Sequence, residues 1–288
     1  MIPPAFDYHA PRSLGEALSL LSDLGSEAKL LAGGHSLLPM MKLRFAQPAH
    51  LIDLTRIADL RGIREQGGNL VIGAMTTEAE LLASAIVRGK VPLLAEGAAS
   101  IADPQVRYKG TIGGDISHGD PGNDHPALML ALDATFVLTG PKGKRSVKAD
   151  GYFLGLYATQ LAPDEILTEI RIPIPVAGSG WSYQKLKRKT GDFATAATAV
   201  LLQMKSTSVA RVAIALTNAG PTALRAKAAE GALIGKPINE ASLRDAARLA
   251  MSICAPTPDQ RGDAAYKTAM CGEMTRRALQ AAAARATG

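Results

Sequence analysis

The fold of this chain is decided by the stretch Lys29-Leu30-Leu31-Ala32-Gly33-Gly34-His35-Ser36-Leu37-Leu38-Pro39-Met40-Met41. Apolar residues that suit a strand run into two glycines, and apolar residues at helical spacing follow. Gly33 and Gly34 lack a Cβ, so they can adopt positive φ and let a ligand approach the backbone. Where such a turn opens a helix, free N–H groups favour an anion such as a diphosphate, and His35 and Ser36 add donors. Alone the signal is weak, because a Gly-Gly turn is most often only a turn.

A second glycine pair lies in the stretch Thr111-Ile112-Gly113-Gly114, inside a long polar segment, residues 103–124. We expect this segment to be a loop, and a long polar loop in a compact domain is usually functional. Asp115 and Asp124 add carboxylates to it. Two such loops can face each other across a cleft and hold an extended dinucleotide. Backbone N–H groups would bind the diphosphate, and a carboxylate would bind ribose or ribityl hydroxyls.

Periodicity predicts three units, spanning residues 1–55, 56–177 and 178–288. In the first we expect a small β-α-β-α-β arrangement, with a helix capped by Ser13 and strands at Ala28–Leu31 and His50–Leu54. Residues 8–11 are predicted to be a loop.

In the second unit we expect hairpins, around residues 67–69 and 140–143, and a strand at 166–173. Thr77 opens a capping box. The third unit is predicted to hold three antiparallel strands followed by three helices, the last with a packing face of Tyr266, Met270, Met274 and Ala278.

Composition excludes several classes of function. The 288 residues are 47% hydrophobic, with a modest net charge of +6 and no dense basic tract, so we expect no nucleic-acid binding. Two cysteines, Cys254 and Cys271, cannot supply a four-thiolate iron–sulfur site. The N-terminus shows no secretory signal, and the longest apolar stretch, residues 127–138, is too short to span a bilayer. We expect a soluble, cytoplasmic protein.

Other sites are disfavoured by missing motifs. No G-x-G-x-x-G follows a predicted strand, no Gly-Lys-Ser/Thr occurs, and no Gly-x-Ser-x-Gly elbow exists, which argues against Rossmann, P-loop and hydrolase sites. His118, Asp120, Asp124 and His125 could hold a metal, but their spacing matches no established ligand motif. The favoured interpretation is a polar loop whose aspartates cap turns and the following helix.

The two glycine motifs, Ala32–Ser36 and Thr111–Gly114, resemble the paired FAD-binding motifs of the flavoprotein subunits of molybdenum hydroxylases. Residues 124–128, 161–173 and 181–193 are similar as well, so the likeness covers essentially the whole chain. It implies an α+β fold: a two-part FAD-binding domain of the vanillyl-alcohol oxidase and p-cresol methylhydroxylase type. A C-terminal domain with a three-stranded antiparallel sheet and a helical layer would follow.

The resemblance also implies a cofactor site and no catalytic or metal-binding residue. The FAD-binding residues would be Ala32, Gly33, Gly34, His35, Ser36, Leu37, Thr111, Gly114, Asp115, Asp124, Leu161 and Lys185. Residues 32–36 and 111–115 would hold the diphosphate, Asp124 would lie near ribityl or ribose hydroxyls, and Leu161 and Lys185 near the isoalloxazine. Asp115 stands where family members often have Asn; a carboxylate accepts but cannot donate, so we expect it to face a hydroxyl or N–H. Related folds sometimes tether FAD through a histidine, yet we expect non-covalent FAD here.

The function implied by the resemblance is electron relay. A large subunit with the molybdenum cofactor would oxidise substrate, a small subunit would pass electrons through [2Fe-2S] clusters, and FAD in this chain would collect them. The acceptor would be a quinone or cytochrome rather than NAD, and the complex a dimer of heterotrimers in the cytoplasm that can associate with the inner face of the membrane. Within the family, the FAD subunit of a xanthine- or nicotine-dehydrogenase-like hydroxylase is one alternative. Outside it, the alternatives are a stand-alone flavin oxidase or dehydrogenase, which the low aromatic content of 4% disfavours, and a non-catalytic dinucleotide-binding protein. The substrate is not predicted.

Overall fold

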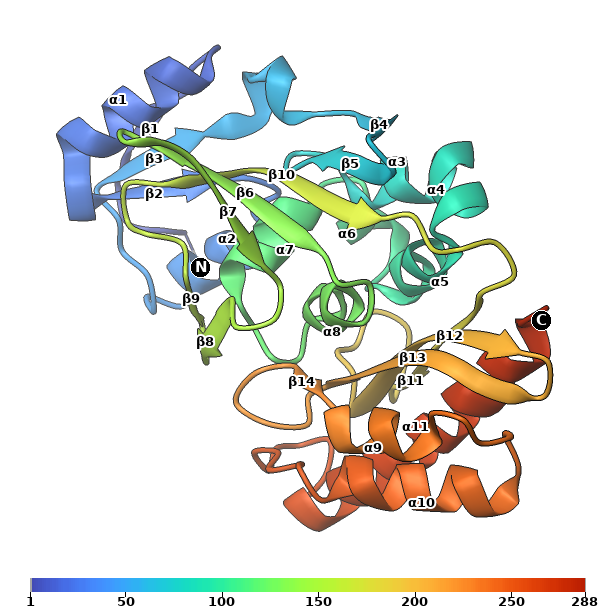
Figure 1. Ribbon diagram of the computed structural model, residues 1–288. Coiled ribbons are helices and arrows are strands. Elements are labelled where there is room, and N and C mark those ends of the chain that lie inside the picture. The colour runs from blue at the N-terminus through green and yellow to red at the C-terminus, as the bar shows by residue number, and fades with distance from the viewer. Residues whose placement is uncertain (1, 288) are drawn as a thin grey trace.

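The N-terminal unit is a three-stranded parallel sheet in the order β1-β3-β2, seen in blue in Figure 1. The computed structural model describes residues 2–287. In this unit β1 is Asp7–His9, α1 Leu14–Leu24, β2 Ala28–Leu31, α2 Leu37–Lys42 and β3 His50–Asp53, with a 3₁₀ turn at Gly25–Glu27. Two more 3₁₀ turns, Leu54–Arg56 and Ala58–Leu60, connect β3 to the second unit.

Most of the N-terminal prediction is confirmed, including the cap of α1, where the Ser13 side chain accepts from the Glu16 N–H. The expectation of a loop at residues 8–11 was wrong for its first half. Tyr8 and His9 pair in parallel with Leu51 and Ile52. A three-residue edge strand is too short to show alternation, so only its partner strand reveals it.

The second unit is a five-stranded antiparallel sheet in the order β4-β5-β10-β6-β7. Its strands are β4 Ile63–Gln66, β5 Asn69–Gly73, β6 Thr135–Gly140, β7 Gly143–Lys148 and β10 Ile166–Pro173, and a small separate hairpin is made by β8 Phe153–Gly155 and β9 Ala158–Thr159. Both predicted hairpins and the strand at residues 166–173 are confirmed.

Six helices belong to the same unit: α3 Glu78–Ala83, α4 Ala85–Lys90, α5 Pro92–Ser100, α6 Pro104–Arg107, α7 Ile112–His118 and α8 Asp124–Ala131. The capping box at Thr77 is confirmed. The expected long loop at residues 103–124 was wrong, because α6 and α7 lie within it. Asp103 and Thr111 cap these two helices, and the second glycine pair lies in the first turn of α7. Glycine is a poor helix former, so its pattern indicates a loop until tertiary packing overrides it.

The C-terminal unit is an antiparallel sheet in the order β11-β12-β13-β14, with helices on its outer face (Figure 1). Its elements are β11 Gly180–Leu186, β12 Ala196–Lys205, β13 Ser208–Thr217, β14 Leu224–Arg225, α9 Lys227–Leu233, α10 Glu240–Met251 and α11 Ala264–Arg285. The three predicted strands and three helices are present. The two-residue β14, paired with Ala215 and Leu216, makes the sheet four-stranded where three were expected. On α11, Met274 and Ala278 are buried, whereas Tyr266 is exposed.

One continuous core joins the second and third units. Ala197 and Ala213 of the C-terminal sheet belong to the same buried cluster as Leu128 of α8. Every residue of α8 is buried, and Figure 1 shows this helix between the two sheets. The start of α8 is therefore a rigid place from which to position side chains. Among residues 2–287, no helix is long and apolar enough to cross a membrane.

Candidate functional site

The two glycine pairs, far apart in sequence, lie directly against each other. A Cβ on Gly33 would be only 2.2 Å from the Lys109 carbonyl oxygen, and one on Gly114 would be 3.3 Å from the Ala32 Cβ. Gly34 has φ of +79°, in the left-handed region that favours glycine. We call this contact between residues 32–37 and 109–114 the glycine cradle. A side chain at Gly33 could not be accommodated without moving backbone.

The side of the cradle formed by residues 109–114 is held in place by the segment that follows β5. The Gly113 N–H donates to the Ala74 carbonyl at 2.9 Å, and Thr111 forms an isolated bridge with Thr77. A Cβ on Gly113 would lie 2.5 Å from the Ala74 carbonyl oxygen. The glycines of α7 are thus required for close packing as well as for access.

The side of the cradle formed by residues 32–37 is open to solvent. Ala32, Gly33 and Gly34 are half-buried, His35 and Ser36 are exposed, and Leu37 begins α2. Backbone N–H groups and two side-chain donors are therefore accessible beside a surface that lacks side chains, which suits the diphosphate of a dinucleotide.

Asp124 and Lys185, both predicted from the resemblance, meet in a buried ion pair. The Lys185 Nζ lies 2.7 Å from Asp124 Oδ2, with side-chain exposures of 4% and 6%. The Tyr183 hydroxyl donates to the other oxygen, Oδ1, at 2.5 Å. Burial first, and then Asp124, raise the pKa of Tyr183 well above its usual value. Each Asp124 oxygen already accepts a hydrogen bond, so the carboxylate is less free for a sugar hydroxyl than we expected.

Leu161, the other residue expected near the isoalloxazine, comes from a different side. It lies two residues after the end of β9. At the start of β9, the N–H of the preceding residue, Tyr157, donates to the Gly119 carbonyl at 3.3 Å. Lys185 lies on β11 and contacts Asp124, at the other end of the connection from α7 to α8. The two residues therefore approach this connection from separate elements.

A second buried pair lies next to Asp115. The His125 Nε2 is 2.8 Å from Glu78 Oε1, and both residues are buried. Burial lowers the pKa of His125, but the Glu78 carboxylate outweighs it and raises the value to about 9. Among the described residues, Asp115 Oδ1 is buried without a hydrogen-bond partner. Burial, opposed by His125 and reinforced by Glu78, Asp124 and Asp120, raises the pKa of Asp115 to about 8.

We call Glu78, Asp115, Asp124, His125, Tyr183 and Lys185 the buried polar cluster. Sequence analysis did not predict two of its members, Glu78 and Tyr183, as site residues. Glu78 follows the Thr77 cap, where an acidic residue indicates only helix capping, and Tyr183 lies in a strand pattern where an aromatic is ordinary. In residues 2–287, no group of three or more His, Cys, Asp or Glu side chains is arranged to hold a metal ion.

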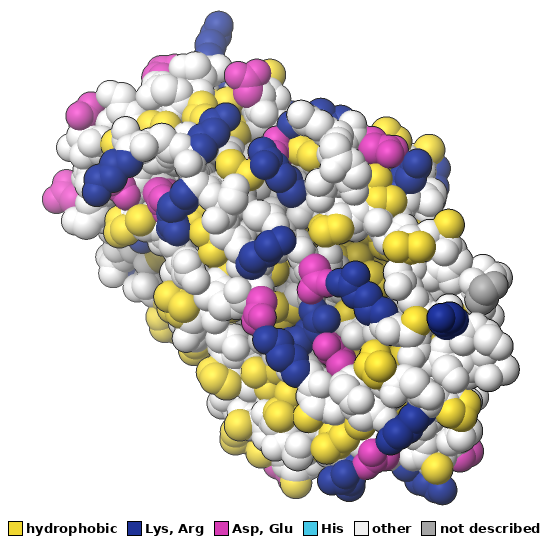
Figure 2. Space-filling model, viewed as in Figure 1, with side chains coloured by type: hydrophobic (Ala, Val, Ile, Leu, Met, Phe, Trp, Pro, Cys, Tyr) yellow, Lys and Arg dark blue, Asp and Glu magenta, His cyan; other side chains and the backbone are white. Residues whose placement is uncertain are grey.

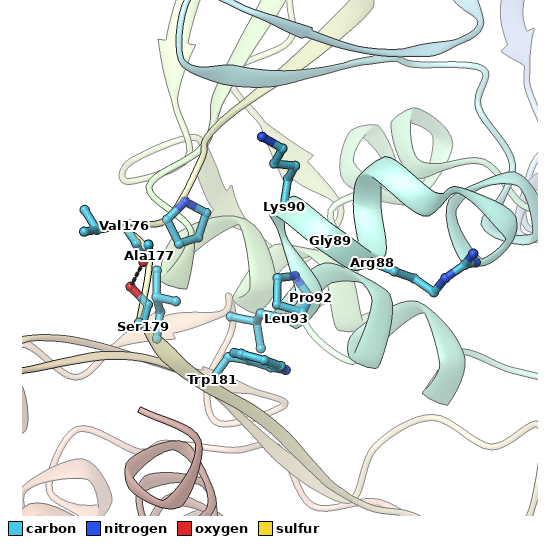
Figure 3. A pocket seen from close by; sticks show the side chains of 12 residues that line it. Arg88, Gly89, Lys90, Pro92, Leu93, Val176, Ala177, Ser179 and Trp181 are labelled. Atoms are coloured by element: carbon cyan, nitrogen blue, oxygen red, sulfur yellow. Dashed lines mark hydrogen bonds between the residues drawn. The ribbon is translucent and has the colours of Figure 1, made fainter. Parts of the chain in front are cut away.

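Two cavities lie away from the glycine cradle. Figure 3 shows one of about 190 Å³, which is lined by Lys90, Leu93 and Trp181 and by the linker that includes Val176 and Ser179. The other, about 310 Å³, lies between residues 149–153 and 222–227. Neither includes a residue that we predicted to bind the cofactor.

The face shown in Figure 2 carries basic and acidic side chains interspersed. This face shows no continuous basic stripe of the kind that follows a nucleic-acid backbone.

Comparison with known proteins agrees with the resemblance. A family model described as the FAD binding domain in molybdopterin dehydrogenase matches residues 4–175, and one described as the CO dehydrogenase flavoprotein C-terminal domain matches residues 181–282. The chain is 61% identical to the carbon monoxide dehydrogenase medium chain of Hydrogenophaga pseudoflava, over 99% of both chains. A solved structure of carbon monoxide dehydrogenase from that organism matches with a TM-score of 0.99 and 63% identity over 100% of both chains.

Within the family, the sequence itself resembles the carbon monoxide dehydrogenase type more than the xanthine or nicotine dehydrogenase types. The nicotine 6-hydroxylase medium subunit of Paenarthrobacter nicotinovorans is 35% identical, over 98% of this chain and 99% of its own length. This identity is well below the 61% found for the carbon monoxide dehydrogenase medium chain. The chain therefore belongs to the family of FAD-binding subunits of molybdopterin dehydrogenases, in the group that contains the carbon monoxide dehydrogenase medium chains.

Proposed function

We propose that this chain is the FAD-binding medium subunit of a carbon monoxide dehydrogenase, and that it relays electrons from a partner subunit to an external acceptor. The observation that carries the proposal is the glycine cradle, in which two motifs about eighty residues apart meet at backbone distance. Such a surface, bare of side chains and lined by N–H donors, fits a dinucleotide better than a small substrate.

In this proposal each part of the site has a separate task. Residues 32–36 and 111–115 hold the diphosphate of non-covalent FAD through backbone N–H groups, while Leu161 and the pair Asp124–Lys185 border the rest of the cofactor. When bound, FAD supplies the capacity to accept electrons and hand them on. The ion pair and Tyr183 keep the start of α8 fixed, so the cofactor meets a rigid wall. We retain residues 1–55, 56–177 and 178–288 as the proposed units.

The proposed partners would hold the iron–sulfur clusters and the molybdenum cofactor. Cys271 is buried and Cys254 half-buried, and two thiols cannot hold a [2Fe-2S] cluster alone. We therefore place the clusters in a small subunit and the molybdenum cofactor in a large one, with two heterotrimers in a heterohexamer. We propose a quinone or cytochrome as the acceptor, and a cytoplasmic complex that can associate with the inner face of the membrane.

Native co-purification tests this function. The complex should contain one FAD per copy of this chain together with molybdenum and iron, and carbon monoxide should bleach its flavin absorbance. Acid precipitation should release the yellow colour, since the FAD is non-covalent. A lone yellow protein that oxidises an organic substrate without molybdenum would refute the proposal in favour of a stand-alone flavin enzyme. A complex bleached by xanthine or nicotine, and not by carbon monoxide, would instead assign another branch of the family.

A further inference from the structure

Residues 74–78 run alongside residues 110–113 and hold that side of the glycine cradle in place. Two backbone hydrogen bonds connect the start of α7 to this segment, and a third runs from the Glu78 N–H to the Gly110 carbonyl at 3.0 Å. Glu78 is also the first residue of α3. Whatever fixes Glu78 therefore fixes the end of the cradle at Gly110.

The Glu78 side chain is bound by His125, in the first turn of α8. Its two carboxylate oxygens lie 2.8 and 3.0 Å from the His125 Nε2. The two residues are 2% and 0% exposed. The other ring nitrogen of His125, Nδ1, is buried and has no hydrogen-bond partner among the described residues. The pair is therefore a direct link between α3 and α8, and it is shielded from water.

This link has a firm attachment on the side of α8. Every residue of α8 is buried, and Asp124, the residue before His125, bonds Lys185 of the C-terminal sheet at 2.7 Å. A buried ion pair adds little net stability over apolar residues of the same volume, because the lost hydration offsets the attraction. The contribution of this pair is therefore geometric, since it fixes Glu78 relative to α8.

We propose that His125 and Glu78 are a positioning pair, which holds residues 110–113 where the glycine cradle needs them and so keeps FAD bound in the complex. The part that concerns FAD rests on the proposed function. His125 acts through another residue and need not contact the cofactor. Its imidazole fixes the Glu78 carboxylate, and the Glu78 N–H fixes the Gly110 carbonyl.

The test uses the complex that co-purifies with this chain, carrying His125→Leu. This change leaves the buried Glu78 carboxylate without its partner, which is strongly unfavourable. Amide hydrogen exchange should become about tenfold faster in peptides that cover residues 110–113, and FAD should dissociate about tenfold faster. Adding Glu78→Gln to the same chain should restore part of both losses, because no unpaired charge then remains. Native exchange rates at residues 110–113 in His125→Leu would overturn the inference.

Lys267→Met is the matched control, because Lys267 is also buried and pairs with Asp259 at 3.0 Å in the C-terminal unit. It should lower the free energy of unfolding but leave exchange at residues 110–113 and FAD dissociation at native rates. FAD dissociation accelerated equally by Lys267→Met would overturn the inference, because general loss of stability would then explain the effect.

Glu78→Gln alone is the milder variant, to be used if His125→Leu does not assemble. It keeps a neutral hydrogen bond, so exchange at residues 110–113 should rise by only about threefold, and unchanged exchange would overturn the inference. A native complex without FAD would refute the proposed function, whereas the exchange rates would still decide whether the pair positions the cradle.

Discussion

The glycine cradle and the buried polar cluster meet at α7, yet they are built on opposite principles. The cradle is open, and it offers backbone where side chains are missing, as at Gly33. The cluster is closed, and its side chains bond to one another, as Asp124 does to Lys185. The difference shows that sterics govern the cradle and charge balance governs the cluster, so substitutions should affect them in different ways.

The largest expected effect is at Gly33. A Cβ there would lie 2.2 Å from the Lys109 carbonyl, so Gly33→Val should push the two sides of the cradle apart and weaken FAD binding by ~100-fold or more. Flavin content after purification and calorimetric titration measure this. Gly15→Val is the matched control, because a Cβ at Gly15 meets nothing within 4 Å. Stoichiometric FAD in the Gly33 variant would count against the site.

Removing the cation of the buried ion pair should give the next largest effect, now on folding. Lys185→Met leaves the buried carboxylate of Asp124 with only Tyr183 as partner, which should lower the free energy of unfolding by about 3–5 kcal/mol. Chemical denaturation measures it. Adding Asp124→Asn to the same chain should restore part of the loss, because no uncompensated charge then remains. A double variant less stable than the single one would contradict this account.

The pair of Glu78 and His125 should make stability depend on pH. Because the pKa of His125 is raised to about 9, its contribution is complete below its ordinary value near 6.5 and is lost as the pH rises through 9. Glu78→Gln should therefore lower the free energy of unfolding on the order of 1–3 kcal/mol at pH 6, and by less at pH 9.5. Denaturation across this range, with the surface variant Glu65→Gln as control, measures it. An equal loss at both pH values would show that the pair acts by packing alone.

The smallest expected effect is at His35. Its side chain is exposed, and replacing it leaves the backbone N–H groups of the cradle in place. His35→Ala should therefore weaken FAD binding by less than ~10-fold, as measured by the same titration. Flavin that stays with the acid-precipitated native protein but not with this variant would reveal a covalent bond that we do not expect.

The sequence determined the parts of this protein that depend on local pattern. Alternation and turn residues predicted the hairpin strands, and capping residues predicted the cap at Ser13 and the capping box at Thr77. The count of two cysteines is too low for a four-thiolate iron–sulfur site in this chain. The paired glycine motifs, together with the similar segments at residues 124–128, 161–173 and 181–193, indicated the family. These features need only neighbours in the chain, so a single sequence contains them.

Tertiary structure decided everything that depends on which distant residues meet. Local pattern did not reveal that β1 and β14 are strands, because each is too short to show a period and forms only against a partner. Nor did it reveal that α7 is a helix, since packing against Ala74 outweighs the low propensity of its glycines. The two buried pairs, Glu78 with His125 and Asp124 with Lys185, belong to the same class. The partners are 47 and 61 residues apart in the sequence, and only the folded chain brings these carboxylates and cations together.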